Sequence, residues 1–243
     1  MNPMYTDTFE ISDFCADRYG RMKPAIILQF AQEIAGHHCL ELGVDYESLA
    51  KKDLFWAVTR HKVEISRLPL RGEKLRLETW PMPTTRVCYP RATVAYDEEG
   101  RECFRIISIW VLMNITTRAM VLPGKSGIHV DGWLRDLEPA MPAGLAAREL
   151  TSSQTRPVRF SDLDRNGHMN NTRCLDWIAD LMDSDFHQSH SPREFTVCYF
   201  SEAREGQQLH MTWDFTEEGT LHVNSHRLEE DKKDRIFAAK IVY

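Results

Sequence analysis

The sequence lacks a long apolar run and an excess of basic charge. No stretch approaches the ~18 consecutive apolar residues that a membrane-spanning helix needs. The 30 lysines and arginines are outnumbered by 36 acidic residues, and the formal net charge is -6. This balance gives no electrostatic reason to expect nucleic acid or an anionic membrane as a partner. We therefore expect a globular chain that binds neither.

Closely spaced cysteines are also missing. The six cysteines are widely spread, with no Cys-x-x-Cys pair and no metal-ligand spacing, so we expect reduced, mostly buried thiols. His187 and His190, like His222 and His226, have ligand-like spacings, but no acidic or cysteine partner completes a zinc site. We predict neither a metal nor any other cofactor.

Several common catalytic and targeting motifs are absent as well. A glycine-rich phosphate loop and a G-x-S-x-G elbow do not occur, which argues against dinucleotide-binding enzymes and the commoner serine hydrolases. The first ten residues lack the basic and apolar regions of a signal peptide. We expect a cytoplasmic location.

The chain does contain an internal repeat, in which the same order of secondary-structure elements occurs twice. A strand, a polar turn and a helix are followed by β-type runs, and after a segment rich in proline and glycine the same order recurs. The first copy predicts a strand at 5–11, a helix from Pro24 to about Gly43, and strands at 55–65, 74–80, 87–96 and 104–114. The second predicts a strand at 156–160, a helix at 171–182, and strands at 194–199, 208–216, 220–229 and 234–243.

A central helix wrapped by an antiparallel sheet is the plan of the hotdog fold. Because the pattern occurs twice, we predict an α+β protein with a tandem, or double, hotdog architecture. We assign residues 1–121 to the N-terminal hotdog, 122–155 to a linker and 156–243 to the C-terminal hotdog.

The polar turn of the second copy, residues 161–171, crowds acids, amides and a histidine in front of the helix. Asp164, Asn166 and His168 alternate, so an extended segment would place their side chains on one side. Turn formation and helix capping by Asn170 or Asn171 explain much of this composition. The first copy, residues 12–23, keeps what we take as the framework of the turn but lacks the asparagine and histidine; the shared residues are Ser12, Asp13, Gly20 and Met22.

This turn resembles the Asp-x-Asn-x-His-x-Asn-Asn segment of bacterial and plant acyl-acyl carrier protein thioesterases. The resemblance extends over nearly the whole chain outside the linker, in residues 17–24, 32–38, 56–60, 67–73, 78–81 and 199–206. It implies a thioester hydrolase that releases free fatty acid from acyl carrier protein and so ends chain elongation. The implied active-site residues are Asp164, Asn166, His168 and Glu202.

At two positions this chain departs from the pattern of the family it resembles. Ala203 stands where plant members carry a cysteine, which argues against a Cys-centred acyl-enzyme at that position. Cys174 stands where the family usually shows an aromatic residue, and we interpret it as a packing residue.

Hydrolysis of a thioester needs a base and a means of stabilising the oxyanion. We expect Glu202 and His168 to activate water, and which of them is the base stays open. Asn166 would hold the carbonyl or the water, together with backbone N–H groups around Gly167 and His168 at the helix N-terminus. Asp164 would fix the tautomer of His168.

The resemblance also implies a partner, an acyl carrier protein bearing an acyl-phosphopantetheine. We expect apolar residues of the first copy to line the acyl chain, namely Ile27, Phe30, Ile34 and Trp56. Because the chain is acidic overall, docking of an acidic carrier needs a local basic surface. We expect Arg165 and Arg173 to supply it, from a cluster that includes Arg156 and Arg159; a homodimer is left open.

Three other functions fit the same pattern. An acyl-coenzyme A thioesterase would use the same chemistry, and a hotdog hydroxyacyl dehydratase also pairs a histidine with an acid. A non-catalytic acyl-binding module would use the polar residues structurally. Acyl-chain length and saturation are not legible in the sequence.

Overall fold

The computed structural model describes residues 3–135, 140–229 and 232–243. The chain divides into two compact units, Met1–Pro142 and Ala143–Tyr243. This boundary falls inside the segment predicted as a linker, residues 122–155, so that segment is shared between the units. Its residues 136–139 lie outside the described residues.

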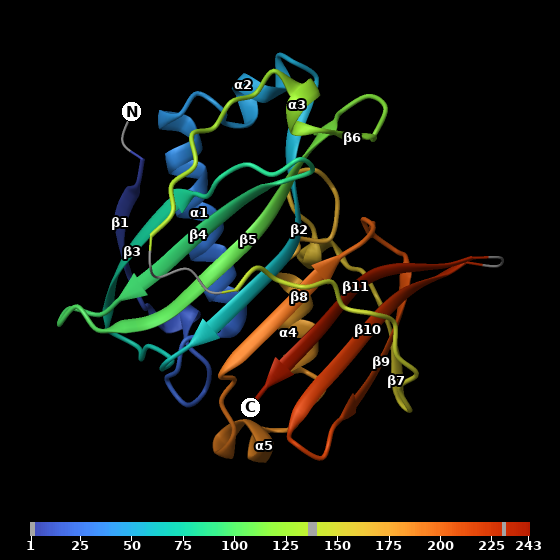
Figure 1. The fold of residues 1–243 in the computed structure, drawn as a ribbon. Coiled ribbons are helices and arrows are strands. Elements are labelled where there is room, and N and C mark those ends of the chain that lie inside the picture. The colour runs from blue at the N-terminus through green and yellow to red at the C-terminus, as the bar shows by residue number, and fades with distance from the viewer. Residues whose placement is uncertain (1–2, 136–139, 230–231) are drawn as a thin grey trace. The chain divides into compact units, whose positions relative to one another are not determined.

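The N-terminal unit is an antiparallel sheet with one long helix against it (Figure 1). The helix α1 (Pro24–Glu41) begins with a proline at its first turn and is followed by Gly43, whose φ of 67° is the left-handed conformation that favours glycine. The sheet order is β1-β3-β4-β5-β2, with β6 on β5. Their bounds are β1 (Tyr5–Glu10), β2 (Leu54–Ile65), β3 (Lys74–Pro81), β4 (Tyr89–Tyr96), β5 (Glu102–Asn114) and β6 (Met120–Val121).

The C-terminal unit repeats this topology strand for strand. Its sheet order is β7-β9-β10-β11-β8, so each strand has a counterpart in the order of the first unit. The strands are β7 (Ser152–Pro157), β8 (Glu194–Tyr199), β9 (Gln208–Phe215), β10 (Thr220–Glu229) and β11 (Lys232–Val242), and the helix against the sheet is α4 (Arg173–Ala179). The predicted tandem of two hotdog units is confirmed.

Two predicted elements need correction. The strand predicted at 156–160 begins earlier, at Ser152, and ends at Pro157, because residues 152–157 pair with β9. The helix predicted at 171–182 spans only Arg173–Ala179, since Asp183 caps a separate short helix, α5 (Ser184–Ser189).

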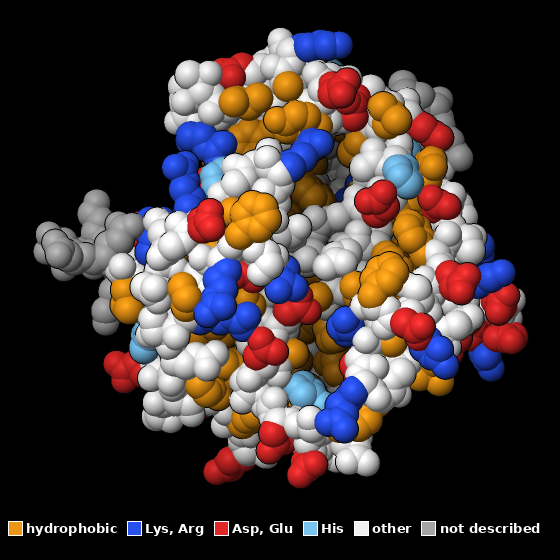
Figure 2. Space-filling model, turned by 180° about the vertical axis from the view of Figure 1, so that it is seen from behind, with side chains coloured by type: hydrophobic (Ala, Val, Ile, Leu, Met, Phe, Trp, Pro, Cys, Tyr) orange, Lys and Arg blue, Asp and Glu red, His pale blue; other side chains and the backbone are white. Residues whose placement is uncertain are grey.

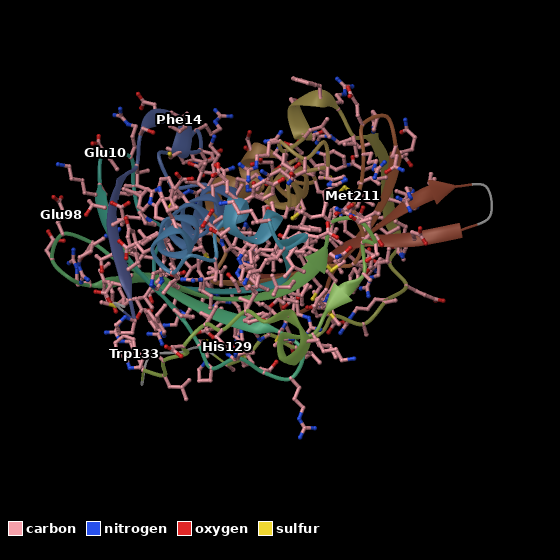
Figure 3. All side chains as sticks on the ribbon, turned by 90° about the horizontal axis from the view of Figure 1, so that it is seen from above. Glu10, Phe14, Glu98, His129, Trp133 and Met211 are labelled. Atoms are coloured by element: carbon pink, nitrogen blue, oxygen red, sulfur yellow. The ribbon has the colours of Figure 1, made fainter. Side chains whose placement is uncertain are left out.

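Some short elements carry no long periodic pattern and were not predicted. They are the 3₁₀ turns η1 (Asp13–Cys15) and η2 (Phe160–Asp162) and the helices α2 (Tyr46–Ala50) and α3 (Pro123–Ser126). Phe14, which stands out from η1 in Figure 3, is 75% exposed, so this turn lies at the surface of its unit.

The segment between the repeats covers sheet surface in each unit. In the N-terminal unit, Trp133 packs edge-on against Trp80 and donates its backbone N–H to the Pro81 carbonyl at 2.9 Å. The guanidinium of Arg135 lies 4.8 Å from the Trp80 ring and donates to Glu78 at 2.8 Å. Because these contacts cover the outer face of β3, residues 77–81 of that strand are buried without alternation.

None of the helices in the described parts of the chain is long and apolar enough to cross a membrane. Basic and acidic side chains are interspersed on the surface seen in Figure 2, in keeping with the small net charge.

Candidate active site

The turn predicted to carry the chemistry lies between η2 and α4 in the C-terminal unit. The Asp164 carboxylate accepts hydrogen bonds from the backbone N–H groups of Asn166 and His168, at 2.8 and 3.2 Å. The Gly167 N–H donates to the Asp164 carbonyl at 3.0 Å, and Gly167 has a φ of 75°, which favours glycine. The turn is therefore closed by its own acid, and it holds Asn166 and His168 on a fixed backbone.

A matching turn occurs in the N-terminal unit. The Asp17 carboxylate accepts from the backbone N–H groups of Tyr19 and Arg21, at 2.8 and 3.0 Å. Gly20, with a φ of 76°, occupies the place of Gly167. Asp17 therefore corresponds to Asp164, whereas tyrosine and arginine stand where the second turn has asparagine and histidine.

This correspondence corrects the alignment on which the predicted framework rests. The Lys23 N–H donates to the Cys15 carbonyl at 3.0 Å, and the Asn170 N–H donates to the Asp162 carbonyl at 2.8 Å. Cys15 therefore matches Asp162, and the similar Ser-Asp pairs that begin at Ser12 and at residue 161 are offset by two positions. The acid that the two turns share is Asp17 in the first and Asp164 in the second, and Asp13 is not part of this match.

His168 and Glu202 meet across two segments that are paired by their backbones. His168 forms an isolated bridge with Arg204, and the Met169 N–H donates to the Ala203 carbonyl at 2.8 Å. This pairing brings the His168 Nε2 atom to 3.2 Å from a Glu202 carboxylate oxygen. The His168 side chain is 16% exposed and that of Glu202 is 43% exposed, so the pair is accessible from solvent on the carboxylate side.

The structure changes the roles expected for Asp164 and for the backbone. The Asp164 carboxylate accepts from backbone N–H groups, and the His168 ring contacts Glu202 instead. These contacts do not support the prediction that Asp164 fixes the tautomer of His168. The N–H groups of Gly167 and His168 both donate hydrogen bonds within the turn, so they are not free to donate to an oxyanion. They also precede α4, which begins only at Arg173.

The turn rests on a buried acid to which the sequence analysis gave no role. Asp162 is 2% exposed and accepts from the Trp177 indole N–H at 3.1 Å and from the Arg159 backbone N–H at 2.9 Å. Arg173 adds a weaker contact at 3.4 Å. An acid directly before the turn and a tryptophan on the following helix were the only signals, and neither pattern specifies the contact.

The helix cap predicted at Asn170 or Asn171 is wrong: the N-cap of α4 is Thr172, with no side-chain cap hydrogen bond, and Asn170 instead closes a turn before it. The Asn170 side-chain oxygen accepts from the Thr172 backbone N–H and hydroxyl, both at 2.9 Å. Asn166, by contrast, is exposed and directs no side-chain atom to the framework of the turn. Its amide is therefore available for a ligand.

Cys174 is a buried residue, consistent with its interpretation as packing. It is 1% exposed, its thiol donates to the Asn171 carbonyl at 2.9 Å, and burial raises the pKa of that thiol to about 12. A thiol with so high a pKa is not a nucleophile near neutral pH. Ala203, at the position of the plant cysteine, is 2% exposed.

The four residues predicted to line the acyl chain lie in the N-terminal unit. Ile27 and Ile34 are fully buried on α1. Phe30 stacks on Phe9 with ring centroids 4.6 Å apart. Trp56 donates its indole N–H to the Val44 carbonyl at 2.8 Å and is partly buried.

The two arginines predicted for docking differ in their surroundings. Arg173 is held by Asp176 and Asp162, so its charge is already compensated within the unit. Arg165 is exposed in the turn between η2 and α4. Arg156 pairs with Asp180 at 2.7 Å and lies over the Trp177 ring, at 4.5 Å from its centroid.

Within the described residues, no three histidine, cysteine, aspartate or glutamate side chains are grouped as metal ligands. The polar side chains brought together are the His168 ring and the Glu202 carboxylate, and Asn166 lies two residues before His168 in the same turn. This set can activate water and bind a carbonyl oxygen without a metal.

Comparison with known proteins agrees with the fold. Residues 2–122 match the family model for the acyl-ACP thioesterase N-terminal domain, and residues 146–243 match the model for the C-terminal domain. The chain belongs to the acyl-ACP thioesterase family.

Individual relatives are distant in sequence. The palmitoyl-acyl carrier protein thioesterase of Gossypium hirsutum is 27% identical over 71% of this chain and 46% of its own length. The acyl-[acyl-carrier-protein] hydrolase FATB3 of Cuphea viscosissima is 24% identical over 83% of this chain and 53% of its own. The chain thus spans about half the length of the curated relatives it matches.

Solved structures share the double hotdog over the full chain. An acyl-ACP thioesterase from Bacteroides thetaiotaomicron superposes with a TM-score of 0.86 at 24% identity, covering 99% of this chain and 98% of its own. The 12:0-ACP thioesterase of Umbellularia californica gives a TM-score of 0.83 at 21% identity, covering 100% and 97%. At these identities the likeness shows the fold alone.

Proposed function

We propose that this protein hydrolyses the thioester of acyl-acyl carrier protein, releasing free fatty acid and ending chain elongation. Family membership supports the reaction class. The observation that carries the proposal is the His168–Glu202 pair, in which the Nε2 atom lies 3.2 Å from a carboxylate oxygen. His168 lies on a turn whose counterpart in the other unit has Arg21 at that position. The two units share the framework of the turn, and the proposed catalytic histidine occurs in the C-terminal unit.

Glu202 is the proposed base. Its half-exposed carboxylate can reach a water molecule, while the Nε2–H of a neutral His168 donates to it and fixes its orientation. Glu202 takes a proton from water as the oxygen attacks the carbonyl carbon. Such a base typically contributes roughly 10²- to 10⁴-fold to the rate.

Collapse of the tetrahedral intermediate breaks the carbon–sulfur bond. The leaving thiol, with an ordinary pKa of ~8.5, needs only weak assistance and takes up the proton held by the Glu202–His168 pair. The exposed Asn166 amide is the proposed donor to the oxyanion. Asp164 acts as a positioning residue, since it holds the backbone from which Asn166 and His168 project.

The acyl chain is proposed to lie against the N-terminal unit, near the four residues Ile27, Phe30, Ile34 and Trp56. Their partial or full burial on and around α1 supports an apolar surface of this kind. Enlarging the buried neighbour Ala31 tests it: Ala31→Phe should shift the released acids to shorter chains. An unchanged product spectrum from a folded variant would reject this position.

Arg165 is the proposed contact for the acidic carrier, and Arg173 contributes less because Asp162 and Asp176 already hold it. Arg165→Glu should raise KM for acyl carrier protein substrates and leave kcat nearly unchanged. Equal KM values in wild type and variant would remove Arg165 from the docking surface. The homodimer and the cytoplasmic location stay predictions.

The proposed reaction is tested by thiol release from acyl-carrier protein and acyl-coenzyme A, assayed side by side. Faster release from the carrier protein supports the proposal, and release from coenzyme A alone would reassign the enzyme. No release from either would leave the dehydratase and the acyl-binding module. Hydration of an enoyl substrate separates those two.

A further inference from the structure

The outer face of the C-terminal sheet carries a cavity that the proposed reaction does not use. In Figure 1 the segment after Ala143 crosses β10 and β11 on the side opposite to α4. A cavity of about 450 Å³ lies between this segment and the sheet, with Arg148, Glu218, His222 and Lys240 among its lining residues. Its size is typical of small-molecule sites, roughly 300–1,000 Å³.

The wall of the cavity is fixed by hydrogen bonds. Arg235 donates to the carbonyls of Leu145 and Ala146 at 2.8 and 3.2 Å. The side chain of Asn224, which is 3% exposed, donates to the Arg148 carbonyl at 3.0 Å and accepts from Arg235 at 3.0 Å. The crossing segment is therefore held by its backbone, and the Arg148 guanidinium is not used to hold it.

The cavity has a surplus of positive charge. Arg148 and Lys240 are permanent cations, and both act on His222, whose pKa is lowered by burial and then by these two charges. In the described part of the chain, none of the three side chains forms an ion pair with a carboxylate. Glu218 is the single acid among the lining residues.

The cavity is separate from the catalytic pair. Arg227, which donates to the Glu202 carbonyl, lies on the same strand as His222. At a rise of ~3.4 Å per residue, the five steps from residue 222 to residue 227 span about 17 Å. A ligand in the cavity would not occupy the place of the thioester.

We propose that this cavity binds a small organic phosphate, with the phosphate held by Arg148, Lys240 and His222 and a hydroxyl or amine of its body held by Glu218. A phosphate monoester carries close to two negative charges at neutral pH, which matches the two permanent cations. The imidazole adds a donor. The cavity is larger than an inorganic ion fills, which favours an organic ester.

The test follows the His222 ring resonance in the full chain labelled with ¹³C-histidine, with the signal assigned by its loss in His222→Gln. Glycerol 3-phosphate, inorganic phosphate and acetate are titrated at constant ionic strength. We expect a saturable shift that is tightest for glycerol 3-phosphate and absent for acetate. Equal affinity for the two phosphates would overturn the organic ligand, and a non-saturating response would overturn the site.

Variants separate a built site from general charge effects. Arg148→Met and Lys240→Met should each weaken glycerol 3-phosphate binding roughly tenfold or more, as expected for loss of a charge-assisted contact. Arg148→Met keeps the backbone carbonyl that anchors the wall. Arg86→Met, at an exposed arginine in the other unit, is the matched control and should bind as wild type does. Unchanged binding in both cavity variants would refute the assignment.

Discussion

Removal of the buried Asp162 carboxylate, which supports the turn between η2 and α4, should destabilise the protein measurably. In Asp162→Ala, the fully buried Trp177 loses the acceptor of its indole N–H, which costs about 1–3 kcal/mol. The Arg159 backbone N–H loses an acceptor as well, worth about 0.5–1.5 kcal/mol because water can partly replace it. Arg173 is 32% exposed and keeps Asp176, so its loss is small. We expect a total of about 2–4 kcal/mol.

Urea unfolding of the full chain, followed by tryptophan fluorescence and by circular dichroism, measures this loss. Asp162→Asn, which keeps one acceptor oxygen, should lose about half as much free energy of unfolding. Asp180→Ala is the control, because the Arg156–Asp180 pair is at the surface and worth about 0–1 kcal/mol. If Asp162→Ala is no less stable than Asp180→Ala, the carboxylate does not support the turn as described.

Three further predictions concern the two turns, His61 and Cys174. Asp17→Ala and Asp164→Ala should each lower the free energy of unfolding by about 1–2 kcal/mol, because each carboxylate accepts two backbone N–H hydrogen bonds. Only Asp164→Ala should also slow hydrolysis. A loss of activity in Asp17→Ala would contradict this prediction. Burial lowers the pKa of His61 to about 3. Below pH ~6.5 the unfolded chain therefore binds a proton at His61 that the folded chain does not bind until about pH 3. The free energy of unfolding decreases as the pH is lowered through this window. Between pH 7 and 5, urea unfolding should show a loss of about 2 kcal/mol that is missing in His61→Gln; equal losses would contradict it. Cys174→Ala should hydrolyse thioesters within about twofold of the wild-type rate, and a large drop in a folded protein would restore a role for that thiol.

The elements that were predicted best are those with a clear apolar run or period between turn residues. The helix from Pro24 and the strands β8 and β10 match their predicted ranges closely, because apolar periodicity and flanking turn residues mark them. The short helix α4 was overestimated, since Asp183 starts a new cap only a few residues beyond its end. Caps of this kind compete with continuation of a helix, and the period alone does not decide between them.

The candidate site was predicted only in part, because the sequence pattern does not show which segments pair in space. Spacing brought attention to His168, and the resemblance added Glu202, but only the backbone pairing of their segments explains why the two side chains meet. The two copies of the turn also looked alignable at Ser12, whereas hydrogen bonds show an offset of two positions at that end. Sequence similarity within a turn does not fix which acid closes it.

The central claim is that Glu202 activates water for thioester hydrolysis with His168 beside it. The most direct measurement is the single-turnover rate of fatty acid release from acyl-acyl carrier protein by wild type and Glu202→Gln, with folding checked by circular dichroism. We expect the variant to be slower by roughly 10²- to 10⁴-fold, because glutamine keeps the shape but cannot take a proton. A folded Glu202→Gln protein that releases fatty acid at the wild-type rate would contradict the account.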